Sequence, residues 1–441
     1  MSVSRNRARA RRAPGAWQRW LAFAGLLACA PAYADESLSV GFAAEPLPAR
    51  IGEAMGGYGG LTTRRAEGVL DPPEARALVL QQGELRVAIV ALDVVIARPN
   101  LRELVVAATH PLDIDVLILV ATHTHSGPGG YLPGWLPARL TAGEYDPAMP
   151  PQLAHAAAVA LERAVADLAP ARLGSGNSPL RLARNRRFSD GAADTELALL
   201  RADFADGRAP VLLFAYGAHA TLLSADSALL SGDWPAAARS ALAADGWRAL
   251  FVPGPLGDQE PAVDLGAFAS VASEQAAVAD FGRAMAMAVE RAAPGAAPPA
   301  AGAQSLRALE RWVDTPPAQF RSLCSLWWLS PFVRSSLEEF VSKRVPFQAV
   351  LAGNAELLTV PAEPSAAIGA ELRASVPAGR TRILVAHAND WLGYVVDPET
   401  YERGGYEACL SLFGSGSAAW LVGSAAETVR RLDASPAEIA K

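Results

Sequence analysis

The chain has 441 residues, a length that allows one large domain or two of ordinary size. Hydrophobic residues make up 51% and charged residues 19%, which indicates a globular protein and excludes a disordered one. The formal net charge of −6 argues against a protein that binds nucleic acid.

The N-terminus has the layout of a secretory signal peptide. Five arginines between residues 5 and 12 precede an apolar run at 20–28, and Ala-Tyr-Ala at 32–34 offers a cleavage site. The apolar run is much shorter than the ~20 residues that a membrane-spanning helix needs. We therefore expect residues 1–34 to be removed and the protein to be exported, either to the periplasm or out of the cell.

Three alternatives remain open for this segment. It may be read as a membrane anchor, as a lipoprotein signal in which Leu-Leu-Ala-Cys places a lipid on Cys29, or as a twin-arginine signal through Arg11 and Arg12. After cleavage Cys324 and Cys409 are left, and an oxidising compartment would allow them to pair. Two cysteines in a chain of this length are more often unpaired, so the sequence leaves the pairing open.

The apolar pattern predicts an α/β fold with a mixed β-sheet core, helices packed outside it, and a site at the C-terminal edges of the strands. In chain order, we expect strands at 75–80 and 86–92 (a hairpin), 115–121, 211–216, from 250, 347–351, 356–360 and 383–386, and helices at 101–109, 151–168, 231–244, 273–291 and from 366.

Three further stretches are open to interpretation. Asp93, at the end of an apolar strand, is a helix cap, a site residue or a partner of one. Residues 292–303, rich in Ala, Pro and Gly, indicate a linker or a surface excursion. The apolar and aromatic stretch at 320–333 is either a core helix or a lip that meets a lipid substrate.

Residues 122–131, with the sequence Thr-His-Thr-His-Ser-Gly-Pro-Gly-Gly-Tyr, follow the strand at 115–121. His123 and His125 are two residues apart, so at a strand end both imidazoles point to one side. Imidazole is the commonest zinc donor in proteins, although strand-end histidines are as often structural. His219 follows the strand at 211–216 in the same way, and α/β folds build sites beyond the carboxyl ends of strands.

Other residues that could bind a ligand or take part in catalysis stand at predicted strand ends or in loops. Arg186 lies in the cationic run Arg-Asn-Arg-Arg at 184–187, which suits a carbonyl or carboxylate. Glu363 and Tyr394 also stand at predicted strand edges, whereas Tyr406 falls in a predicted polar loop.

The order of these motifs resembles the N-terminal catalytic domain of the neutral/alkaline (non-lysosomal) ceramidases, zinc amidases that split ceramide into sphingosine and a fatty acid. The resemblance spans about residues 38–425. It rests on the histidine motif at 122–131, Asn-Arg-Arg at 185–187, Ser-Gly-Asp-Trp-Pro at 231–235, Pro-Ala-Glu at 361–363 and Ala-Asn-Asp at 388–390.

The resemblance implies two sets of site residues. By this resemblance a Zn²⁺ ion is held by His123, His219, Glu363 and Tyr394. The residues implied to act in catalysis are His125, Arg186 and Tyr406.

Two departures from the family pattern stand out. Where the family has a serine once proposed as nucleophile, this chain has Glu260 in Gly-Asp-Gln-Glu-Pro-Ala. The chain also stops at Lys441, without the immunoglobulin-like domain that longer members carry, so residues 35–441 are expected to form one zinc hydrolase domain.

We therefore expect an exported zinc-dependent amidohydrolase that cleaves the amide bond of ceramide or a related N-acyl lipid. Its partners would be the N-acyl lipid and, at most peripherally, a membrane, but not nucleic acid. The alternatives are a zinc hydrolase of another amide or ester, and a non-catalytic envelope protein that binds lipid.

Overall fold

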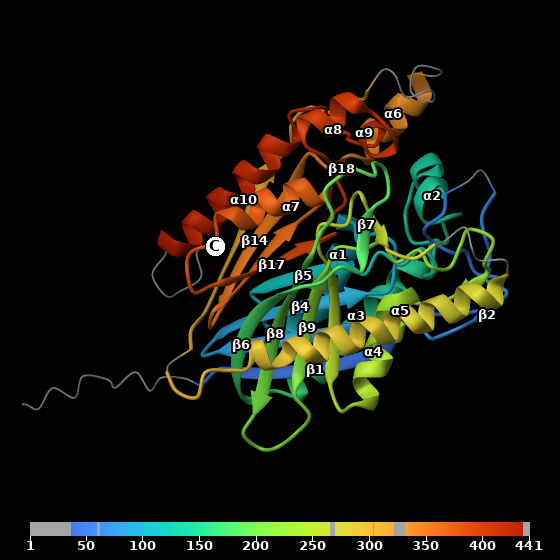
Figure 1. The fold of residues 1–441 in the computed structure, drawn as a ribbon. Helices are drawn as coiled ribbons and strands as arrows, with labels where there is room; N and C mark the ends of the chain where they lie inside the picture. The colour runs from blue at the N-terminus through green and yellow to red at the C-terminus, as the bar shows by residue number, and fades with distance from the viewer. Residues whose placement is uncertain (1–36, 60–61, 265–269, 303, 322–330, 435–441) are drawn as a thin grey trace, which may run out of the picture. The chain divides into compact units, whose positions relative to one another are not determined.

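A computed structural model describes residues 37–434, except 60–61, 265–269, 303 and 322–330 (Figure 1). Residues from Ser37 onward form one compact unit. The expected signal peptide at 1–34, including Cys29, lies outside the described residues. The same holds for most of the apolar stretch at 320–333 and for Cys324, while Cys409 takes part in a disulfide bond.

A mixed eight-stranded sheet forms the larger part of the core in the described chain. Its β4–β5 and β9–β11 pairs are parallel and its other pairs antiparallel. In spatial order, its strands are β11 (Arg248–Pro253), β9 (Val211–Tyr216), β8 (Glu196–Phe204), β6 (Ala169–Pro179), β1 (Ser39–Pro46), β3 (Glu74–Gln82), β4 (Leu85–Leu92) and β5 (Val116–Ala121).

A four-stranded sheet and three two-stranded pairs complete the β-structure of the described residues. The four-stranded sheet has the order β13 (Leu306–Asp314), β14 (Arg344–Ala352), β15 (Ala355–Val360) and β17 (Thr381–Ala386). The pairs are β10 (Leu229–Leu230) with β2 (Gly68–Val69), β12 (Gln259–Pro261) with β7 (Ala183–Asn185), and β16 (Glu363–Pro364) with β18 (Tyr394–Val395).

Helices cover the outer faces of both sheets. Figure 1 shows α7 and α10 along the sheet that contains β14 and β17, and α4 and α5 over the larger sheet. The helices are α1 (Pro99–Thr109), η1 (His110–Leu112), α2 (Trp135–Thr141), α3 (Met149–Ala166), α4 (Asp233–Ala244), α5 (Val271–Ala292), η3 (Ala293–Ala296), α6 (Pro331–Phe340), α7 (Ala366–Ala374), α8 (Pro398–Arg403), α9 (Tyr406–Cys409) and α10 (Ser417–Ala434). Within the described part of the chain, none combines the length and apolar character needed to span a bilayer.

The larger sheet coils back on itself. Arg76 of β3 donates a hydrogen bond of 2.8 Å to the backbone oxygen of Ala249 in β11, although four strands separate β3 from β11 in the sheet order. Just beyond the ends of β5 and β9, Thr124 and Ala220 form a parallel bridge. The right-handed twist of sheets accumulates with each strand, so a wide sheet brings distant strand ends together. The two histidine-bearing strands therefore deliver their loops to one place.

Buried side chains of both sheets meet in a shared apolar layer. Its members include Val40, Leu78 and Ile118 from the larger sheet and Val350 and Ile383 from the smaller one. Sheets pack about 10 Å apart through such inward-facing side chains. The prediction of a mixed sheet core with helices outside is confirmed. Because the two sheets pack together, loops that follow strands of both can meet at one place.

The regular apolar runs of the sequence predict their elements well. The hairpin at 75–80 and 86–92 is β3–β4, and the strand at 211–216 is β9 to the residue. The pair at 347–351 and 356–360 is the antiparallel β14–β15 hairpin. The sequence pattern does not reveal β6, β8, β13 or α10. In β6, glycines and polar residues hide the alternation.

One loop prediction is wrong, and another is confirmed for most of its residues. Tyr406 was expected in a polar loop but begins the short helix α9. Gly404 and Gly405, both with positive φ, separate α9 from the helix before it. Residues 297–302 are mostly exposed, as expected of a surface excursion, whereas at the start of this stretch α5 continues into η3. Ala293 and Ala296 are buried there, and the backbone of Ala296 packs against Gly174, where a Cβ would not fit.

Asp93 anchors a buried charge network beneath the histidine loop. Its carboxylate pairs with Arg239 of α4 at 3.0 and 2.6 Å and accepts from the Thr122 hydroxyl at 3.0 Å. It also accepts from the backbone N–H of Glu74 at 2.9 Å. Asp93 therefore does not cap a helix. It fixes the residue next to His123.

Replacing Arg239 by Met should lower the free energy of unfolding by about 3–5 kcal/mol, because the Asp93 carboxylate would be left buried without its cation. Denaturant titration measures this change. Arg430→Met is the matched control, since the Arg430 side chain is 67% exposed and pairs with Glu427 only at the surface. That variant should change stability by less than about 1 kcal/mol. Equal losses in the two variants would contradict a structural role for the network.

Candidate metal centre

His123 stands two residues beyond the end of β5. It has a φ of 63°, a left-handed conformation that side chains with a Cβ rarely adopt, so its backbone is strained. Its Nδ1 lies 2.6 Å from the backbone oxygen of Val95. A carbonyl only accepts hydrogen bonds, so the proton is on Nδ1 and Nε2 carries a free lone pair.

His219 follows β9, and a hydrogen bond from Nδ1 to a backbone oxygen fixes its ring in the same way. Its Nδ1 lies 2.8 Å from the backbone oxygen of Gln259 in β12, which leaves the Nε2 lone pair free. The indole of Trp234 donates to the backbone oxygen of His219 at 3.0 Å and so holds this part of the chain in place. The side chain is fully buried.

Glu363 brings a carboxylate to these two nitrogens from β16. Its Oε2 lies 3.5 Å from Nε2 of His123 and 3.3 Å from Nε2 of His219. Its Oε1 accepts from the indole of Trp391 at 2.6 Å. Ser365 caps α7 through its side chain, so Glu363 does not serve as the cap of that helix.

The three atoms fit a metal ion. Nε2 of His219 and Oε2 of Glu363 are buried without a hydrogen-bond partner among the described residues. Ligands at about 2.0–2.2 Å from a tetrahedral zinc ion lie roughly 3.3 Å from one another. The separations of 3.3 and 3.5 Å match that spacing, and two imidazoles with one carboxylate are a common catalytic zinc set.

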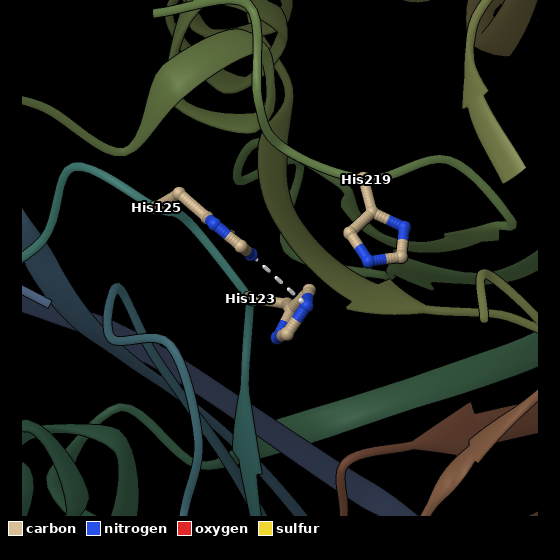
Figure 2. A group of neighbouring side chains, drawn as sticks. All are labelled: His123, His125 and His219. Carbon is tan, nitrogen blue, oxygen red and sulfur yellow. Dashed lines mark hydrogen bonds between the residues drawn. The ribbon is translucent and has the colours of Figure 1, made fainter. Parts of the chain in front are cut away.

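His125 lies beside these ligands, as Figure 2 shows. Its Nε2 is 3.3 Å from Nε2 of His123, and the ligand atoms of His123, His125 and His219 lie within 4.8 Å of one another. The backbone N–H of His125 donates to Ala220 at 3.1 Å, which joins the two histidine loops.

Electrostatics favour the ligand forms of these groups. Burial lowers the pKa of His123, and burial together with Arg186 and His123 holds the pKa of His219 well below its usual value. Burial raises the pKa of Glu363, but the interactions with His123 and His387, the hydrogen bond from Trp391 and the charge of Arg186 outweigh this, so the net pKa is lowered. Neutral imidazoles and an ionised carboxylate are the forms that bind metals.

Arg186 and the two predicted tyrosines lie on one side of the centre. Tyr394 is the register partner of Glu363 in the parallel β16–β18 pair. Arg186 donates to the Tyr394 hydroxyl at 3.1 Å and to Glu407 at 2.9 Å. Tyr406 packs edge-on against Tyr394 with ring centroids 5.6 Å apart, and its side chain is half exposed. The structure thus brings all seven predicted residues into one neighbourhood.

The pKa values of Tyr394 and Arg186 are both raised, so both side chains keep their protons. Burial, reinforced by Glu363, raises the pKa of Tyr394 well above its usual value. Burial lowers the pKa of Arg186, but Tyr394 and Glu407 outweigh it and the net pKa rises. Arg186 is therefore a permanent cation, and Tyr394 is a neutral phenol whose oxygen already accepts one hydrogen bond.

A cavity of about 570 Å³ opens beside the centre. Polar and aromatic side chains line much of it, so it suits a ligand with a polar end. The lining residues are Tyr58, His125, Arg186, Arg187, Thr221, Leu222, Ser224, Ala225, Asp226, Glu274, Tyr394 and Tyr406.

Sequence reasoning overlooked His387 and Glu407. His387 is fully buried and stacks on His123, with ring centroids 4.1 Å apart. It follows β17 much as His123 follows β5, and that repetition was the available signal. The Glu407 carboxylate forms ion pairs with both Arg186 and Arg187. No spacing in the sequence indicates these pairs. Glu260, which replaces the family serine, pairs with Arg184 at 2.8 Å.

Comparisons with known proteins agree with this geometry. Residues 49–245 match the family described as neutral/alkaline non-lysosomal ceramidase, N-terminal. A neutral ceramidase from Mycobacterium tuberculosis (strain ATCC 25618 / H37Rv) is 28% identical over 202 residues, which cover 41% of this chain and 31% of that relative.

Two solved ceramidase structures share the fold over most of the chain. A crystal structure of neutral ceramidase from Pseudomonas aeruginosa has a TM-score of 0.77 at 22% identity, covering 92% of this chain and 76% of that one. A ceramidase complexed with C2 has a TM-score of 0.76 at 22% identity, covering 92% and 77%. The family match ends before Glu363 and Tyr394, and over that part of the chain the comparisons show a shared fold.

Glu363→Gln should keep the fold but weaken zinc binding by more than about 100-fold, because the amide retains the volume and loses the anionic donor. Competition with a chelator measures the affinity, and circular dichroism checks the fold. Glu427→Gln, on the surface of α10 beside Arg430 and Arg431, is the control and should bind zinc like the wild type. Wild-type affinity in Glu363→Gln would rule out a ligand role.

Proposed function

We propose that this chain is a zinc-dependent amidohydrolase that cleaves the amide bond of ceramide or a related N-acyl lipid. One observation carries the proposal. The Nε2 lone pairs of His123 and His219 converge on a buried, ionised Glu363 carboxylate at ligand spacing. The similarity of residues 49–245 to the neutral ceramidases supports the reaction class.

The donor set suits zinc and leaves room for chemistry. His123, His219 and Glu363 would hold the ion, with the neutral Tyr394 phenol as a weaker fourth donor. A bound zinc ion supplies a water ligand whose pKa falls to about 7 and polarises the carbonyl of the amide.

The remaining residues would handle protons and orient the substrate. His125 lies at the cavity wall as a neutral imidazole, because burial together with His123 and His219 holds its pKa well below its usual value. Its place beside His123, at 3.3 Å between the two Nε2 atoms, is what suits it to transfer a proton during the reaction. Arg186, a fixed cation in the same wall, would stabilise negative charge that develops on the carbonyl oxygen. The half-exposed Tyr406 would donate a hydrogen bond to a substrate oxygen.

The residues that line the cavity suit a substrate with a polar head and an acyl chain. Its lining joins the arginines Arg186 and Arg187 with the carboxylates Asp226 and Glu274 and the aromatic rings of Tyr58 and Tyr406. Such a mixture suits amide and hydroxyl groups, while the acyl chain would extend out of the cavity. We also propose export of the protein, on the strength of the signal-like N-terminus, and peripheral contact with a lipid surface.

Hydrolysis of a fluorescent ceramide tests the proposal. The wild-type protein should release the labelled fatty acid, lose this activity with a chelator and regain it when zinc is added. His123→Ala should be inactive under all these conditions, because one ligand is missing. Absence of release from wild-type protein that has bound one zinc ion would contradict ceramide as the substrate.

A panel of N-acyl and O-acyl lipids separates the alternatives. Turnover of another amide or ester, but not of ceramide, would assign the zinc hydrolase to a different substrate. Lipid binding without turnover of any member would instead indicate the non-catalytic envelope protein.

His125→Ala should keep most of the bound zinc but lower the rate of hydrolysis by about 10²–10⁴-fold, the usual size of a general acid–base contribution. Zinc stoichiometry and kcat of the same preparation measure both quantities. Loss of zinc equal to that in His123→Ala would show that His125 is a ligand and would refute the catalytic role.

A further inference from the structure

Arg64 is a partly buried cation that no carboxylate neutralises among the residues that the structure describes. Its guanidinium donates instead to three backbone oxygens, those of Gly56 at 2.9 Å, of Ser224 at 3.3 Å and of His125. Its Nε is buried and has no hydrogen-bond partner in the same part of the chain. Burial lowers the pKa of Arg64, so its charge is held here at a cost. A cation in such a place is expected to serve the segments that it contacts.

The three oxygens belong to three separate segments around the cavity. Gly56 begins the glycine-rich stretch 56–59, His125 lies in the histidine loop, and Ser224 lies in the loop that follows β9. Tyr58 of the glycine-rich stretch lines the cavity together with His125 and Ser224. A guanidinium is planar and its donors point in fixed directions, so it holds the carbonyls that it contacts in one relative arrangement. Arg64 therefore ties three parts of the cavity wall to one another.

The ring of His125 lacks the anchor that the other two histidines of the centre have. In His123 and His219 a hydrogen bond from Nδ1 to a backbone oxygen fixes the ring. Nδ1 of His125 is buried without a partner among the described residues. The ring packs edge-on against Tyr58, with centroids 4.9 Å apart, and the Tyr58 hydroxyl donates to the backbone oxygen of Leu223 at 2.7 Å. The orientation of His125 thus depends on its backbone and on Tyr58.

Arg64 reaches His125 by both of these routes. It donates to the backbone oxygen of His125, and its guanidinium carbon lies 5.0 Å from the ring centroid of Tyr58, a cation–π distance. Between them, Gly57 has a φ of 106°, and a Cβ there would lie 2.3 Å from Cα of His125. The glycine-rich stretch consequently packs directly on the backbone of His125, and Arg64 fastens the two together.

We propose that Arg64 is a positioning residue that holds His125 in the orientation needed for proton transfer beside the metal centre. The inference rests on the proposed function, in which His125 transfers the proton. Arg64 contacts the backbone of His125 and not its imidazole, so it acts through His125 and takes no part in the chemistry itself. His123 and His219 keep their own anchors, so loss of Arg64 should disturb proton transfer and leave metal binding intact.

A double-mutant cycle between Arg64 and His125 tests the proposal with a fluorescent ceramide as substrate. Arg64→Met removes the donors, and it should lower kcat at least about tenfold, change KM less than about threefold and keep the bound zinc. In the His125→Ala protein the same change should lower kcat by less than about threefold, because the residue through which Arg64 acts is gone. Arg65→Met is the matched control and should have the kcat of the wild type, since the Arg65 side chain is 54% exposed and pairs with Glu144 at the surface.

Arg64→Lys is the second variant, because it keeps the charge and retains the fold if the methionine variant does not. It loses the planar fork, so its kcat should lie between those of the wild type and Arg64→Met and should show the same dependence on His125. An equal fall in kcat with and without His125 would indicate a general loosening of the loops and overturn the proposal. A raised KM at unchanged kcat would assign Arg64 to the shape of the cavity alone and would also overturn it.

Crystal structures of the wild type and of the Arg64 variants test the position of His125 without measuring turnover. We expect His123 and His219 to stay in place, and the His125 ring to leave its contact of 3.3 Å with His123 or to occupy several conformers. A His125 ring that keeps the wild-type position in both variants would overturn the proposal. A displaced ring, in a protein whose wild type hydrolyses no N-acyl lipid, would support the positioning by Arg64 and contradict only the proposed function.

Discussion

Two backbone carbonyl oxygens determine what the centre of this protein can do. Val95 and Gln259 each accept a hydrogen bond from Nδ1 of a histidine, and each thereby fixes both the proton position and the direction of the ring. Side chains alone would leave both imidazoles free to rotate or to change tautomer. With Nδ1 occupied, Nε2 of His123 and His219 must face Glu363, and a metal-binding geometry is built before any metal arrives.

The two sheets bring the residues of this centre together. The coiled eight-stranded sheet brings the loops after β5 and β9 together, and the second sheet contributes Glu363 and His387 from beyond β15 and β17. The buried pair of Asp93 and Arg239 supports Thr122 beneath the histidine loop. Buried ion pairs add little net stability when compared with apolar packing, so a pair placed here is better understood as fixing a loop.

The sequence predicts the fold class and the residues that gather at the candidate site, but not the order of the strands. Histidines after apolar strands are visible as local patterns, and the family resemblance places Glu363 and Tyr394 although they lie far from His123 in the chain. The order of strands was not predictable, because pairing such as that of β1 with β6 depends on contacts between distant residues. His387 was overlooked because the sequence shows only that it follows a strand, whereas its stacking on His123 depends on how distant parts of the chain pack. Glu407 is hidden for the same reason.

The site draws its parts from residues as far apart in sequence as Val95 and Glu407. Contacts of such large sequence separation close late, since the entropy of long loops must be lost before they form. During synthesis the two histidine loops emerge well before the strands that carry Glu363 and His387. The metal centre therefore cannot nucleate folding as it does in small zinc domains, and it assembles only when nearly the whole chain is in place.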